Sequence, residues 1–216
     1  MPTLLHLDSS ADLEASRSRA ITAVFADEWR SQGDQFTVVN RDLHRHPVPH
    51  LADAALHWPP RLRPAGATPA ASDESLQQTL IAELLAADVL LVGAPLYNYS
   101  IPSSLKAWID HIHVPGVTAP FDVPTQPLAG RPAVIVSSRG GSYDAGTPSE
   151  NWDHGVPVLE LILGNALGMA TRVIATSLTL ADTVSALADQ RERSHAEFAT
   201  ARADAAASAR SIAAGF

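Results

Sequence analysis

Residues Asp88–Ala94 have the sequence DVLLVGA, a continuous apolar run that ends at Pro95. A strand with one face in water alternates apolar and polar residues, whereas a strand covered on both faces is apolar throughout. The run therefore predicts a central strand of a parallel sheet, with a layer of helices on each side.

Strand and helix patterns alternate outward from this run. Four further apolar stretches are predicted strands: Thr3–Asp8, Phe36–Asn40, Ala133–Ser138 and Arg172–Ser177. Helical spacing of apolar residues predicts the helices Ser18–Ser31, Asp73–Ala87, Pro102–Ile112 and Asp153–Leu167, and a long alanine-rich helix from about Thr183. This alternation predicts an α/β fold, a doubly wound five-stranded parallel sheet with helices on both faces. No repeat or shift in composition divides the chain, so residues 1–216 are expected to form one domain.

One long segment, residues 42–72, lacks this periodicity and contains six prolines. A connection of this length inside a compact domain is usually a functional excursion. His44, His46 and His50 within it could ligate a metal, but no carboxylate pattern accompanies them, and no metal site is predicted. Trp58, which two prolines follow, is expected to pack in an interface or a lid.

The composition excludes several classes of protein. The chain has 216 residues, 15 Lys and Arg against 23 Asp and Glu, a net charge of -8 and no Cys. Its 46% hydrophobic content argues against disorder, and its acidity argues against nucleic acid or an anionic membrane as the main partner. Without Cys there is no disulfide framework and no thiolate chemistry. With no signal-peptide or membrane-spanning pattern either, we expect a soluble, cytoplasmic protein.

Ligands of such sheets bind beyond the carboxyl ends of the strands, where the strand order reverses. The loop after the first predicted strand carries Ser9, Ser10 and Ser16–Arg19 but lacks the glycine patterns of dinucleotide and P-loop sites. Hydroxyls, arginines and free amides at a helix start favour a phosphate, although Ser16 or Ser18 could simply cap the helix. Arg17, Arg19 and Arg139 fall on this edge, where they would make positive charge local in an acidic chain.

Two further loops reach the same edge. After DVLLVGA come Pro95–Pro102, in which Tyr97 and Tyr99 flank Asn98, and Ser100 is expected to cap the next helix. Ser138–Tyr143 follows a later strand and holds Gly140 and Gly141, which allow a backbone to approach a flat ligand closely. Loop packing and a plain tight turn explain each loop alone. The conjunction of three such loops at one edge favours a ligand site.

Residues 95–110, PLYNYSIPSSLKAWID, resemble the P-x-Y-N-x-x-x-P-x-x-L-K-x-x-x-D signature of the FMN-dependent NADH:quinone oxidoreductase and azoreductase family. Gly116–Thr118, Ser137–Gly141, Tyr143 and Gly146 follow in the order of that family. The resemblance implies a flavodoxin-like fold, non-covalently bound FMN and a homodimer with active sites at the interface. It also departs from the family: Ala119 and Pro120 precede Phe121, and Asn165 and Ala166 stand where relatives carry bulky residues.

The resemblance assigns roles to particular residues. It implies that Ser10, Ser16, Arg17 and Ser18 hold the FMN phosphate. Pro95, Leu96, Tyr97, Asn98 and Tyr99 would run along the isoalloxazine, and Ser138, Arg139, Gly140 and Gly141 would contact its other edge, with Tyr143 closing over it. The implied substrate pocket contains Tyr99, Phe121 and Ile162.

The implied activity is two-electron reduction of quinones and azo compounds by NADH or NADPH in a ping-pong reaction. The flavin would carry the chemistry, so no catalytic side chain is predicted. A non-enzymatic electron carrier of the flavodoxin type remains the alternative, and the acidic charge suits one. A flavin-binding sensor is a third possibility, without support from any extra domain.

Overall fold

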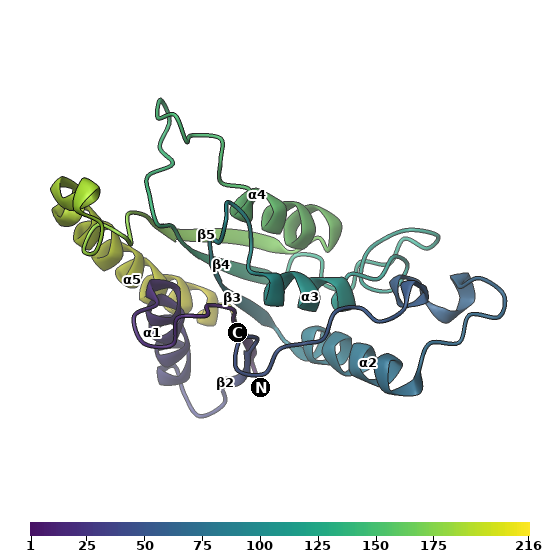
Figure 1. The fold of residues 1–216 in the computed structure, drawn as a ribbon. Helices are drawn as coiled ribbons and strands as arrows, with labels where there is room; N and C mark the ends of the chain where they lie inside the picture. Colours follow the sequence, from purple (N-terminus) through teal and green to yellow (C-terminus); the bar gives the residue numbers. More distant parts are fainter.

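The computed structural model describes residues 1–216 and is built on a sheet of five parallel strands (Figure 1). The strands are β1 (Thr3–Asp8), β2 (Thr37–Asp42), β3 (Val89–Pro95), β4 (Pro132–Ser138) and β5 (Ala170–Thr176). Their spatial order is β2-β1-β3-β4-β5, so the order reverses between β1 and β3. The predicted doubly wound sheet is therefore confirmed, with strand ends shifted by one or two residues.

Helices cover both faces of the sheet. They are α1 (Arg17–Ser31), α2 (Ala71–Ala86), α3 (Ser103–Ile112), α4 (Gly155–Leu159) and α5 (Arg191–Ala213). Figure 1 shows α1 beside α5 on one face and α2, α3 and α4 on the other, and the apolar side chains form one cluster on each face.

The side chains of β3 explain its uninterrupted apolar sequence. Leu90 and Val92 belong to the cluster beneath α2 and α3, whereas Val89 and Leu91 belong to the cluster beneath α1 and α5. Successive side chains of a strand point to opposite faces, so both sets must be apolar when both faces are covered. This double burial is the interpretation that the sequence DVLLVGA favoured.

The alanine-rich helix α5 packs against α1. Ala201, Ala205 and Ala209 recur every fourth residue on one side of α5 and are buried there. Their small side chains let the two helices approach closely. The helix starts at Arg191 rather than near Thr183, because residues 185–190 form a short 3₁₀ helix first.

The helix predicted over Asp153–Leu167 is also shorter and less regular. After α4 the backbone widens into π-helical turns over Glu160–Ala166. The amide of Leu167 donates to the carbonyl of Ile162, five residues earlier, at 2.9 Å. Apolar periodicity cannot distinguish such widened turns from a regular helix.

The excursion of residues 42–72 lies over α2 and α3 and contains two short 3₁₀ helices, Ala54–His57 and Pro60–Leu62. Arg61 pairs with Asp122 at 2.8 Å, and Arg63 pairs with Glu74. The chain holds no group of three or more His, Cys, Asp or Glu side chains in a metal-binding arrangement. None of its helices combines the length and the apolar character needed to cross a bilayer.

Candidate functional site

The loops after β1, β3 and β4 meet at the carboxyl edge of the sheet and enclose a cavity of about 410 Å³. Eight predicted cofactor residues line it: Ser10, Ser16, Arg17, Pro95, Leu96, Tyr97, Ser138 and Gly140. The six others, Ser18, Asn98, Tyr99, Arg139, Gly141 and Tyr143, lie outside its lining. The structure thus brings the three predicted loops together at one site.

The start of α1 forms one wall of the cavity. Ser16 is the N-cap residue, and its Oγ accepts a hydrogen bond from the Arg19 amide at 3.3 Å. The amides of Arg17 and Ser18 have no acceptor in the protein. Capping and anion binding are therefore compatible here, since the cap leaves two donors free at the positive end of the helix. The Ser18 side chain is buried behind the wall, with its Oγ 3.0 Å from that of Ser16.

The three arginines at this edge are all engaged with carboxylates, so they do not supply the free positive charge that the sequence predicted. Arg17 lines the cavity, but its guanidinium lies 3.6 Å from Asp182 and donates to the Ser194 carbonyl at 3.0 Å. Arg139 pairs with Asp153 at 2.7 Å. The positive end of α1 is therefore the main attraction for an anion here.

Arg19 points into the protein beneath the first loop. It forms two hydrogen bonds to the Asp42 carboxylate, at 2.7 and 2.9 Å, and two to the Ser10 carbonyl, at 2.7 and 3.2 Å. Burial raises the pKa of Asp42, but hydrogen bonds from Arg19 and from the amides of Arg45 and His44 outweigh it and lower this pKa to about 2. Arg19 thus positions the Ser10 segment and ties it to the end of β2.

The second loop makes a tight turn over Tyr97–Ser100. The amide of Tyr97 donates to the Ser100 carbonyl at 2.9 Å, and the amide of Ser100 donates back at 3.0 Å. Asn98 and Tyr99 have φ angles of +48° and +68°, which match the two central positions of a type I′ turn. Ser100 therefore closes this turn and does not cap α3, which starts at Ser103 with no side-chain cap.

The Tyr97 hydroxyl joins the first and second loops. It accepts a hydrogen bond from the Ala11 amide at 3.0 Å and lies 3.2 Å from the Ser10 Oγ. The amides of Asn98 and Tyr99 have no acceptor in the protein and face outward on the exposed turn. This turn therefore presents two backbone donors beside the cavity.

A segment that the sequence analysis did not select completes the cavity. Thr179, Leu180 and Thr183, which follow β5, line it opposite the first loop. The amide of Leu180 donates to the Gly140 carbonyl at 3.3 Å, and that of Leu178 donates to the Gly141 carbonyl at 3.2 Å. The signal was available, because β5 ends at the same edge as β4 in a parallel sheet.

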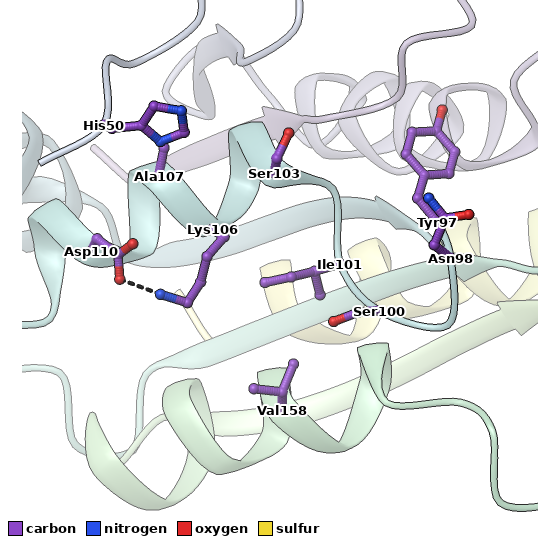
Figure 2. Close-up of a pocket in the computed structure, with 10 residues that line it drawn as sticks. All are labelled: His50, Tyr97, Asn98, Ser100, Ile101, Ser103, Lys106, Ala107, Asp110 and Val158. Carbon is purple, nitrogen blue, oxygen red and sulfur yellow. Dashed lines mark hydrogen bonds and ion pairs between the residues drawn. The ribbon is translucent and has the colours of Figure 1, made fainter.

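A second cavity, of about 490 Å³, lies on the other side of the turn along α3 (Figure 2). Tyr97 lines both cavities, and Asn98 and Ser103 line the second one. Lys106, the only lysine of the chain, borders this cavity and pairs with Asp110 one turn along α3, as the sequence predicted.

The three predicted substrate residues are separate in the chain. Tyr99 packs against Trp152, whereas Phe121 packs against Trp58 of the excursion with 5.3 Å between ring centroids. Ile162 borders a third cavity, of about 220 Å³, below Lys106. One protomer therefore does not gather these residues into one pocket. Tyr143 is partly buried near Tyr99; burial is the main cause that raises the pKa of Tyr143.

A family model described as flavodoxin-like fold matches residues 2–206. An FMN-dependent NADH:quinone oxidoreductase of Kineococcus radiotolerans is 61% identical over 212 residues, covering 98% of this chain and 100% of that protein. The chain belongs to the FMN-dependent NADH:quinone oxidoreductase family. A relative of the same name from Streptomyces avermitilis is 42% identical and covers 99% of this chain and 98% of its own length. The resemblance to this family and the prediction of an enzyme are thereby confirmed.

Solved structures agree on the fold of this oxidoreductase family member. An azoreductase from Bacillus anthracis superposes with a TM-score of 0.80 at 18% identity, covering 97% of this chain and 99% of that one. An FMN-dependent NADH-azoreductase from the same species, solved in complex with FMN, gives a TM-score of 0.78 at 18% identity and covers 99% of this chain and 100% of that one. At this identity the likeness concerns the flavodoxin-like fold alone.

Proposed function

We propose that the chain is an FMN-dependent oxidoreductase that transfers two electrons from NADH to small quinones. The observation that supports it most is the cavity at the switch point, which three loops of the family signature line together. The relatives named above carry the same function in their names. All of residues 1–216 would act as one FMN-binding domain.

The residues at the cavity fit FMN chemically. A phosphate needs several donors in one place, and the free amides of Arg17 and Ser18 lie beside the hydroxyls of Ser10 and Ser16. Added side-chain carbon at Gly141 would meet no atom within 4 Å, so space is open there for a flat ring. We assign the phosphate to the start of α1 and the ring to the second and third loops.

FMN, when bound, supplies the hydride and electron transfer chemistry. The backbone amides of Asn98 and Tyr99 provide fixed donors that favour negative charge beside the turn. Leu96 and Pro95 provide apolar walls, and Tyr97 holds the first two loops at a fixed spacing. No side chain of the chain needs to act as nucleophile or general base.

We further propose a ping-pong order, in which donor and acceptor occupy one place in turn, and azo compounds as second acceptors. The cavity along α3 starts at Tyr97 and Asn98 and offers room for either reactant. Steady-state rates measured at several NADH and quinone concentrations should give parallel double-reciprocal lines. Intersecting lines would contradict the shared place.

A homodimer accounts for the separated substrate residues. Phe121 is 63% exposed and projects, with Trp58, from the far end of α3. In a two-fold dimer, Phe121 of one protomer would complete the substrate pocket of the other. Phe121→Ala should then slow quinone reduction without weakening FMN binding, and analytical ultracentrifugation should show a dimer.

The direct test is the purified protein. It should be yellow, release FMN on denaturation and reduce p-benzoquinone with NADH in the absence of any partner protein. FMN binding without such turnover would favour the alternative, a carrier of electrons for a protein partner. A colourless protein that binds no FMN in titration would reject both functions.

A further inference from the structure

Trp152 and Tyr99 form an exposed aromatic pair at the carboxyl edge of the sheet. Their ring centroids are 5.4 Å apart with the planes at 85°, an edge-to-face arrangement. Tyr99 is 49% exposed and Trp152 is 50% exposed, although both follow strands of the central sheet. Two large rings left half in water beside a cavity offer apolar area that a ligand can cover.

The backbone beneath the pair is fixed by several hydrogen bonds. The His154 amide donates to the Tyr99 carbonyl at 2.9 Å, which joins the two loops directly. Asp153 accepts from the Gly155 amide at 2.8 Å and pairs with Arg139 at 2.7 Å. A surface that is already ordered loses little conformational freedom when a ligand binds, so its contact area is converted efficiently into affinity.

The conformation of Tyr99 points to a ligand as well. Its φ of +68° lies in the left-handed region, where glycine and asparagine are usual and a large side chain is rare. Such strained residues persist where the surrounding structure holds them, and they cluster at functional sites. Tyr99 also directly follows Asn98, which lines the cavity along α3.

We propose that Tyr99 and Trp152 form a stacking surface for the electron acceptor and that it favours quinones with fused rings over single-ring quinones. The proposal rests on the proposed function. A second fused ring adds a planar face for offset or edge-to-face contact, which a single ring lacks. The surface would thus set acceptor preference, while FMN and NADH bind elsewhere in the site.

The test compares two quinones on the FMN-loaded protein. Trp152→Ala should lower kcat/KM for menadione about three- to tenfold and that for p-benzoquinone less than about twofold, the range expected for one aromatic contact. Trp152→Phe should recover most of the loss. Phe216→Ala is the matched control: Phe216 is 58% exposed and packs edge-to-face on Trp29, away from the carboxyl edge, so both quinones should react as with the unaltered protein.

Binding separates this proposal from the proposed function. Calorimetric titration of menadione into the oxidised holoenzyme should show a Kd raised about three- to tenfold by Trp152→Ala. If menadione binds in this way but no quinone is reduced, the proposed function fails and the stacking surface stands. An equal loss for both quinones, or no change in Kd, would overturn the stacking surface even if turnover is normal.

Discussion

Replacing Arg19 by Met tests the buried ion pair beneath the first loop. Arg19 has two hydrogen bonds to Asp42, and both side chains are mostly buried. The pKa of Asp42 is about 2 in the folded protein, against 3.8 for an unperturbed carboxyl. This difference corresponds to about 2 kcal/mol of stability at pH 7. We expect Arg19→Met to lose about that amount, because it leaves the Asp42 carboxylate buried without its partner.

The effect has a defined pH dependence. Since the folded pKa of Asp42 lies below its unfolded value, the contribution is complete above about pH 5 and is lost as the pH falls through about 2. At pH 3 about half should remain. The assay is a double-mutant cycle of Arg19→Met and Asp42→Asn, with urea unfolding at pH 7, 5 and 3. The cycle separates the pair from other effects of each substitution.

Two results would refute this reasoning. A coupling energy below about 0.5 kcal/mol at pH 7 would place the pair among ordinary surface ion pairs. A coupling energy that is the same at pH 7 and pH 3 would show that ionisation of Asp42 is not its source. Arg30→Met serves as the control, because Arg30 pairs with Asp27 on the exposed side of α1 and should change stability by less than about 0.5 kcal/mol.

Other substitutions probe the rest of the site and its support. Ser16→Ala should cost about 1 kcal/mol through loss of the helix cap and should also weaken FMN binding, which urea unfolding and quenching of FMN fluorescence measure separately; an effect on stability alone would separate the cap from the phosphate site. Gly93→Ala should lower stability by about 1–3 kcal/mol, seen as a reduced Tm, because its Cβ would lie 2.6 Å from the buried Oδ1 of Asp8, and an unchanged Tm would contradict the tight packing between β1 and β3. Lys106→Met should change the free energy of unfolding by no more than about 0.5 kcal/mol, since its partner Asp110 is one turn away on the surface of α3, and a larger loss would mean that this pair is not solvated.

The sheet could be predicted from the sequence because both of its faces are covered. Strands such as Val89–Pro95 must then be apolar throughout, and this pattern survives in the sequence without any knowledge of neighbours. Helix ends were less predictable. The late start of α5 and the π-helical turns after α4 depend on hydrogen bonds that apolar spacing does not encode.

The candidate site was predictable as a set of loops but not in its electrostatics. Strand order places the first, second and third loops together, so Ser16, Leu96 and Gly140 meet as expected. The partners of Arg19 and Arg139 are distant in the sequence, and nothing local shows that Asp42 and Asp153 neutralise them. The same holds for Trp152, whose neighbour Tyr99 comes from another loop.

The contact between Arg17 and Ser194 has a consequence for how the protein is made. The guanidinium of Arg17 and the carbonyl that it binds are 177 residues apart in the chain, and the segment after β5 forms one wall of the cavity. During synthesis from the N-terminus, the first loop emerges long before these partners exist. The cavity is therefore complete only when nearly the whole chain has left the ribosome, which makes flavin loading a late event that follows synthesis rather than guides it.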